Sequence, residues 1–236
     1  MRVLSSALDP RFGGPQKRSL SVARELRQAD IETVFLIPEG DDGFARVASD
    51  DGFEIIRTPL PRIRSPTRPY DNAQFLLGFR SCRKRVTEIL SRHDIDIVHA
   101  NGPLNYAVAL ATAKSDSRLV WHFNDTLTPT PLKQLSSHAA RRMADQIVVA
   151  ADAVHDYYFP AHVDTETIYA PVDLTEFDPE TFTEDRDRYR SQFDINENTL
   201  VLGAVGNLNP AKGFTYLIDA VASVSRQVDD LAVFIV

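Results

Sequence analysis

The chain has 236 residues, of which 43% are hydrophobic and 25% charged, which excludes a disordered or fibrous protein. No apolar run approaches the roughly 20 residues that cross a bilayer, and Asp9 interrupts the apolar start too early for a signal peptide. The single cysteine, Cys82, excludes an intrachain disulfide and a cysteine zinc site, and the net charge of -7 argues against general nucleic-acid binding. We therefore expect a cytoplasmic protein without nucleic-acid partners.

Short apolar runs alternate with stretches of helical period through most of the chain. The first run, residues 3–8, leads into the pair Gly13-Gly14 and then into a helical pattern. Six further runs are predicted to be strands: residues 33–37, 54–56, 95–99, 118–121, 146–149 and 167–169. Several of these runs are almost continuously apolar, as strands are when helices cover both faces of a sheet. The pattern predicts an α/β, Rossmann-like fold with a doubly wound parallel sheet.

The clearest helical pattern, over residues 75–89, places Cys82 on its apolar side, so we expect this thiol to fill the core. Cations gather before and along this helix: residues 57–85 hold eight cations and one acid, which leaves 18 cations and 32 acids for the rest. Such a cluster can attract an anionic acceptor or rest on an acidic membrane surface, and an ordinary solvated face is the alternative. Three arginines of its proline-rich loop (residues 57–70), Arg62, Arg64 and Arg68, are acceptor-side candidates, together with His99, Asn101 and Asp125 further along the chain.

A hydrophilic stretch, residues 178–198, is predicted to be a linker or hinge after an amino-terminal domain of residues 1–177. The block that follows, residues 199–236, has the pattern of a strand, a helix over residues 214–228 and a further strand. A unit this small rarely folds unaided. We therefore expect an incomplete second domain that exposes apolar residues on its helix and that either self-associates through this segment or is poorly ordered beyond Thr199.

Glycines and polar residues follow several predicted strands, at the edge where open α/β sheets bind ligands. At Gly13-Gly14 the backbone amides can approach an anion closely, and the following helix directs its positive end to the same place. A plain tight turn is the alternative for this glycine pair. In the second block Gly206 lies in the loop after a strand, and Lys212 would add a positive charge suited to a diphosphate. A solvated lysine is the alternative there.

Two neighbouring strands are predicted to end in histidines. His99 is followed by Asn101, and His122 is followed by Asp125, so both histidines would face one crevice at the carboxyl edge. The alternative for each is a structural histidine with satisfied hydrogen bonds. Metal-ligand spacing and the Gly-x-Ser-x-Gly nucleophile elbow are absent, which argues against a metal site and a serine hydrolase.

These stretches together resemble the retaining GT-B glycosyltransferases of family 4. The resemblance rests on Gly13-Gly14, residues 96–99, the strand ending in His122, residues 144–150, residues 168–177, and Gly206 through Lys212 to Phe214. Enzymes of this kind have two facing Rossmann-like domains with the active site between them. The amino-terminal domain receives the acceptor, and the carboxy-terminal domain holds the nucleotide sugar.

The resemblance implies a role for several residues. Gly14 would approach the donor phosphates or the acceptor, His122 would contact the transferred sugar near its reacting carbon, and Lys212 would bind the diphosphate. It implies no metal and no cofactor beyond the nucleotide-diphosphate sugar, because cations and helix ends neutralise the leaving group. The acceptor would be a sugar or a lipid-linked sugar, such as a glycolipid or polysaccharide precursor, met at the inner face of the membrane.

Three departures from the family pattern keep two alternatives open. Asn207 stands where the family usually has an arginine, Phe123-Asn124 intervene before Asp125, and the paired glutamates of the family would lie beyond Val236. The chain is therefore expected to be truncated within its donor domain and inactive alone. The alternatives are a non-catalytic sugar- or nucleotide-binding module and a GT-B sugar-nucleotide epimerase. A shared pocket requires that Gly14 and His122 lie on the same side of the first sheet.

Overall fold

The structure is a computed structural model that describes residues 1–63, 69–174 and 176–236. The chain divides into two compact units, Met1–Pro171 and Val172–Val236, which are described separately. The organisation predicted above, with a hinge over residues 178–198 and an incomplete donor domain, stays a prediction.

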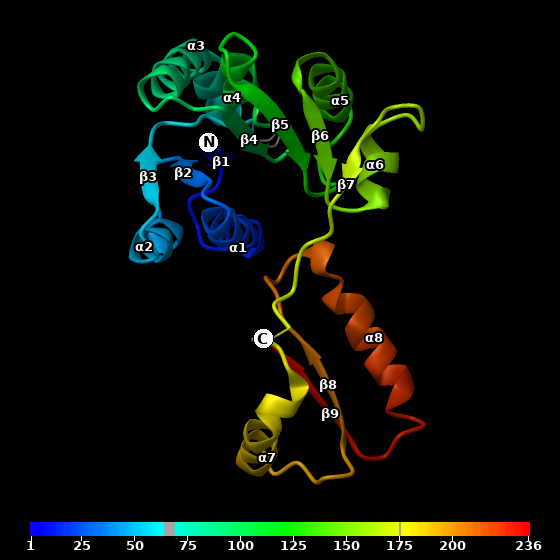
Figure 1. The fold of residues 1–236 in the computed structure, drawn as a ribbon. Coiled ribbons are helices and arrows are strands. Elements are labelled where there is room, and N and C mark those ends of the chain that lie inside the picture. Colours follow the sequence, from blue (N-terminus) through cyan, green and yellow to red (C-terminus); the bar gives the residue numbers. More distant parts are fainter. Residues whose placement is uncertain (64–68, 175) are drawn as a thin grey trace. The chain divides into compact units, whose positions relative to one another are not determined.

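The first unit is built on one parallel sheet of seven strands in the order β3-β2-β1-β4-β5-β6-β7 (Figure 1). The strands are β1 (Arg2–Ala7), β2 (Glu32–Ile37), β3 (Glu54–Arg57), β4 (Ile97–Asn101), β5 (Arg118–Phe123), β6 (Gln146–Val149) and β7 (Glu166–Thr167). The order reverses between β1 and β4, which is the switch point of a doubly wound sheet. The predicted α/β, Rossmann-like fold is confirmed.

Helices cover both faces of this sheet. On one face lie α1 (Gly14–Gln28) and α2 (Gly43–Asp50), and on the other lie α3 (Pro69–Arg92), α4 (Tyr106–Thr112), α5 (Leu132–Met143) and α6 (Asp152–Tyr158) (Figure 1). Cys82 of α3 is fully buried, as predicted, and its burial raises the pKa of the thiol to about 11. Among the described residues, no helix is long and apolar enough to cross a membrane.

The alternation of side chains along the strands gives the two faces different cores. Under α3 to α6 the core is large and rich in aromatic side chains, with Trp121, Phe123 and Leu4 fully buried. Under α1 and α2 a smaller core surrounds Phe35. Its ring packs edge-on against the ring of Phe44, with 5.0 Å between the ring centroids. Between α1 and strands β4 to β6, this second face carries both polar and apolar side chains.

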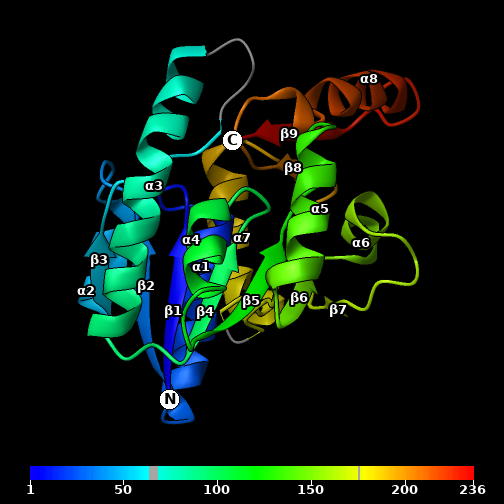
Figure 2. The same ribbon diagram turned by 90° about the horizontal axis from the view of Figure 1, so that it is seen from above.

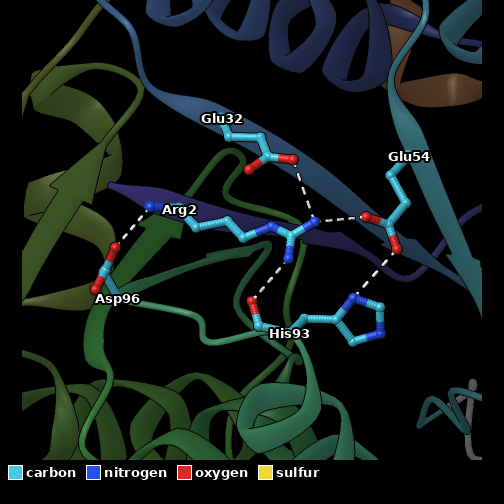
Figure 3. A network of polar contacts seen from close by, with 5 residues as sticks. All are labelled: Arg2, Glu32, Glu54, His93 and Asp96. Carbon is cyan, nitrogen blue, oxygen red and sulfur yellow. Dashed lines mark hydrogen bonds and ion pairs between the residues drawn. The ribbon is translucent and has the colours of Figure 1, made fainter.

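A network around Arg2 ties together the amino ends of the first strands (Figure 3). The guanidinium Nη2 donates to Glu32 at 3.2 Å and to Glu54 at 2.7 Å, and Nη1 donates to the carbonyl of His93 at 3.0 Å. The Arg2 amide donates to the Asp96 carboxylate at 2.6 Å. The network fixes the sheet at the edge opposite to the one that carries the predicted site.

Several element boundaries differ from the prediction. Strand β4 continues two residues past His99 to Asn101, and β5 continues past His122 to Phe123, so neither histidine ends its strand. The loop predicted up to Tyr70 is shorter, because α3 already includes that residue. The hydrophilic stretch predicted as a linker contains the 3-10 turn η1 (Pro179–Phe182) and helix α7 (Thr183–Gln192), which has no buried residue.

The second unit contains the parallel pair β8 (Leu200–Ala204) and β9 (Leu231–Ile235), the turn η2 (Pro210–Lys212) and helix α8 (Phe214–Val224). Helix α8 is four residues shorter than predicted and has no buried residue. Tyr216 and Ile218 on this helix are exposed, in agreement with the prediction of an uncovered apolar surface.

Candidate active site

The glycine pair lies where helix α1 begins. Gly13 is the N-cap residue, with an extended backbone (φ -147°), and Gly14 is the first helical residue. A Cβ atom built on Gly14 would meet nothing within 4 Å, so neither packing nor a positive φ angle requires glycine there. Among the described residues no side chain caps the helix, and its own first turn holds no acid. Neither a cap nor an acid of this turn therefore compensates the positive end of α1, where an external anion can bind.

A groove of about 840 Å³ lies at the carboxyl edge of the sheet, beside this helix start. Three predicted acceptor-side residues line it together: Arg62, Asn101 and Asp125. The rest of the lining is mainly apolar: Leu8, Pro15, Ile63, Pro103, Leu104, Leu127, Pro129, Pro131 and Leu132. Arg64 and Arg68, the other two acceptor-side candidates, lie outside the described residues.

Asp9 is a groove residue that the sequence analysis did not select. Its carboxylate accepts hydrogen bonds from the Arg11 side chain at 2.6 and 3.0 Å and lies 3.6 Å from Arg62. The hydrogen bond from Arg11 lowers the pKa of Asp9 to about 2, although its partial burial opposes this. Asp9 is therefore ionised at neutral pH. Its position directly after the first strand was the available signal.

The two predicted histidines do not face this groove, contrary to expectation. They line a smaller cavity of about 200 Å³ between α1 and the sheet, together with Arg18 and Ser19 of α1. His99 and His122 face the same side because His122 is paired in register with Asn101, two residues after His99. Gly14 begins the helix that covers this side, so Gly14 and His122 lie on the same side of the sheet, as a shared pocket requires.

The histidines form the middle of a line of polar contacts. Ser5 Oγ lies 3.4 Å from His99 Nδ1, and His99 Nε2 lies 3.1 Å from His122 Nδ1. The other ring nitrogen of His122, Nε2, is buried and has no hydrogen-bond partner among the described residues. Both ring nitrogens of His99 lie within hydrogen-bonding distance of a partner, as expected of a structural histidine. His122 keeps one nitrogen without a partner among the described residues.

Burial keeps both imidazoles neutral. It lowers the pKa of His99 to about 4, with a further contribution from the positive charge of Arg18. Burial also lowers the pKa of His122 to about 3, and the neighbouring His99 and Arg18 add to this effect. At neutral pH, His122 can therefore offer a sugar hydroxyl a neutral hydrogen-bonding nitrogen, but no positive charge.

Asn101 connects the cavity to the groove, because it lines both. Its amide nitrogen donates to Ser19 Oγ at 3.0 Å, and its oxygen accepts a hydrogen bond from Asn124 Nδ2. The oxygen of Asn124 is buried without a partner in the described part of the chain. Asn124 is thus a second groove residue that the sequence analysis did not select, because it entered there only as a departure from the family pattern.

In the second unit, the predicted phosphate-binding residues lie against each other. A Cβ atom on Gly206 would be 3.5 Å from Lys212 Cδ and 3.5 Å from the ring of Phe214, so the lysine stem crosses the glycine closely. Lys212 ends η2, and Gly213 turns the chain into α8 with a left-handed backbone (φ 68°) that favours glycine. The lysine is therefore held two residues before the positive end of α8.

Comparison with solved structures shows the same fold in a protein solved with UDP-glucose, in a glycosyltransferase and in an epimerase. HepE from Anabaena, solved with UDP-glucose, has a TM-score of 0.74 and 19% identity, and the match covers all of this chain and 60% of that one. A glycosyltransferase from Rickettsia africae has a TM-score of 0.68 and 14% identity, over 99% and 68% of the two chains. The UDP-GlcNAc 2-epimerase of Neisseria meningitidis, bound to UDP-GlcNAc, has a TM-score of 0.65 and 13% identity, over 100% and 65%.

The chain thus spans about 60% of the length of HepE. No curated protein sequence matches it significantly. A model of the glycosyl transferase 4-like domain matches residues 13–155, which begin at the glycine pair and include both histidines, Asn101 and Asp125. This match extends over more than half of the sequence, and the chain therefore belongs to the glycosyl transferase 4-like family.

Proposed function

We propose that this protein transfers a sugar from a nucleotide-diphosphate sugar to a sugar or lipid-linked acceptor, with retention of configuration. One observation carries the proposal: two features lie on the same side of the sheet. These are the uncapped start of α1 at Gly14 and the unsatisfied Nε2 of His122. Ser19, next to the histidine cavity, is about 7 Å along the helix from Gly14. A sugar diphosphate is long enough to reach both places.

In this proposal different groups bind the transferred sugar and neutralise the charge of the diphosphate. His122, neutral because of its burial, forms a hydrogen bond with a hydroxyl of the transferred sugar near the reacting carbon. The amino end of α1 then stabilises negative charge on the leaving diphosphate. Lys212, just before α8 in the second unit, is proposed separately as a residue that binds the diphosphate. No metal enters this scheme. Asn207 leaves Lys212 without the second cation usual in this family.

The groove supports a lipid-linked acceptor more than a free polar sugar. Its lining is mainly apolar, and its carboxylates, Asp9 and Asp125, can accept hydrogen bonds from a few sugar hydroxyls. An acceptor with a sugar next to an apolar group fits this division. Self-association through the exposed apolar side of α8 is a separate part of the proposal.

The test uses protein expressed from its complete reading frame, incubated with radiolabelled UDP-glucose or UDP-GlcNAc and with extracted lipid-linked acceptors. We expect label to enter the lipid fraction, and the His122→Gln variant to lose on the order of 100-fold in kcat. His138→Gln, at an exposed histidine of α5, is the matched control. Binding of the nucleotide sugar without turnover would favour the binding module instead.

The epimerases among the structural neighbours make a second function testable in the same reaction. An epimerase forms its product from the donor and water alone. A changed sugar or free nucleotide in the absence of acceptor, without label in any acceptor, would therefore replace transfer by epimerisation.

A further inference from the structure

Helix α3 has an unusually apolar outer surface at its amino-terminal half. Tyr70, Leu76 and Leu77 are 74%, 72% and 83% exposed, and these are the three most exposed large apolar side chains described in the first unit. The inner side of the same helix is packed normally, with Phe75 and Val86 buried. The outer leucines are therefore not required by the fold of this unit.

Cations continue the same outer strip toward the carboxyl end of the helix. Arg80, Arg83 and Lys84 fall with the three apolar residues within about 140° of the helix circumference. Lys84 lies 3.8 Å from Glu88, whereas Arg80 and Arg83 have no ion pair among the described residues. In a chain with a net charge of -7, this strip is a local positive surface.

The mixed character of the strip favours a lipid surface as the partner. Leucines and cations lie on one side of the helix, so a membrane along which α3 lies would contact both kinds of side chain. Leucines could then enter the acyl region while the arginines stay among phosphate headgroups. An acidic protein would match the cations but would leave two adjacent leucines without an apolar partner.

We infer that the outer strip of α3, formed by Tyr70, Leu76, Leu77, Arg80, Arg83 and Lys84, docks on a membrane that contains anionic lipids. This surface goes beyond sugar transfer, because docking needs neither donor nor acceptor.

The strip lies beside the groove. The amino-terminal end of α3 is at the side toward which the strand arrows point (Figure 2). Phe75 of α3 lines a depression together with Arg62, and Arg62 also lines the groove. Docking would therefore bring the groove close to the lipid surface.

The test is co-sedimentation of the purified chain with vesicles, without any sugar nucleotide. Vesicles of phosphatidylglycerol and phosphatidylcholine are compared with vesicles of phosphatidylcholine alone, at low and high salt. We expect binding to the anionic vesicles only, weakened by salt. Replacing Arg80, Arg83 and Lys84 by Gln should reduce the partition constant on the order of 100-fold, and Leu76→Ser with Leu77→Ser at least about tenfold.

Matched controls come from α5, where Arg141, Arg142 and Leu135 are also exposed. Arg141→Gln with Arg142→Gln, and Leu135→Ser, should leave binding unchanged, and thermal melting checks that every variant is folded. Equal binding to both kinds of vesicle, no binding to either, or equal effects of the α3 and α5 variants would overturn the inference. So would a dimer in size exclusion that only the α3 leucine variant abolishes, since a second copy would then be the partner. Failed sugar transfer with intact vesicle binding would refute the proposed function alone.

Discussion

The histidine pair, in which His122 is buried and His99 partly buried, predicts a specific dependence of stability on pH. In the folded protein the pKa values of His99 and His122 are lowered to about 4 and about 3, whereas an unfolded histidine has a pKa near 6.5. Below pH 6.5 the unfolded chain therefore binds protons that the folded chain does not. Stability should fall as the pH drops from about 6.5 toward 4 and 3, and it should be insensitive to these groups above pH 7.

The size of the effect follows from the linkage. When the pH falls from 7 to 5.5, each histidine should lower the free energy of unfolding by about 1.2 kcal/mol, and the pair by roughly 2.5 kcal/mol. This is a large part of the 5–15 kcal/mol typical of a domain. The pH range is favourable because most carboxylates stay ionised throughout it.

The assay is urea unfolding of the chain and of the His99→Gln, His122→Gln double variant at a series of pH values. Glutamine can occupy each site and does not titrate, so the variant should lose most of the slope between pH 7 and 5.5, whatever its stability at pH 7. His138→Gln, at an exposed position, should keep the slope. Parallel pH curves for the chain and the double variant would show that the histidines are not held neutral, and the role given to His122 would lose its basis.

Three further substitutions test the site and its frame. Gly14→Ala should leave the free energy of unfolding unchanged or raise it by up to about 1 kcal/mol, because the added Cβ meets nothing there. The same change should reduce turnover about 10- to 100-fold. The control, Gly78→Ala in α3 near Pro61, should not affect turnover. Asp125→Asn keeps the oxygen that accepts a hydrogen bond from the Leu127 amide but removes the charge. We expect about a tenfold higher KM for the acceptor and an unchanged KM for the donor. The control, Asp116→Asn at the opposite edge of the sheet, should change neither KM. Arg2→Met should destabilise the chain by about 1 to 2 kcal/mol in urea unfolding, while Arg24→Met, which breaks an exposed ion pair with Asp51, should cost under about 0.5 kcal/mol.

The strands could be predicted because burial on both faces leaves continuous apolar runs, as in Ile147 to Val149. Helix α7 could not, because it buries no residue and therefore has no apolar period to detect. Helix α2 is short, and its buried residues, Phe44, Ala45 and Ala48, span little more than one turn. A helix that buries no side chain, or buries side chains over only about one turn, leaves little apolar periodicity from which it can be predicted.

The site was predicted less completely for a related reason. The positions of Gly14, Asn101 and Asp125 at the carboxyl edge followed from strand order alone. The direction of His99 and His122 did not, because a strand that is apolar on both faces gives no indication of which face a given residue occupies. Asp9 and Asn124 become visible as groove residues only when the loops after β1 and β5 are placed side by side.

The two faces of the sheet explain why the polar residues could gather without loss of the core. On β4 and β5 the residues facing α3 to α6 are Val98, Ala100, Trp121 and Phe123, all fully buried, and they belong to the large core. The residues between them point the other way, so His99, Asn101 and His122 share the side of α1 and contribute little to that core. Alternate residues of the same strands therefore form the core and the proposed site. A substitution such as Trp121→Ala should cost about 3–5 kcal/mol of stability, whereas its neighbour His122 should affect the pH dependence and turnover more than the fold.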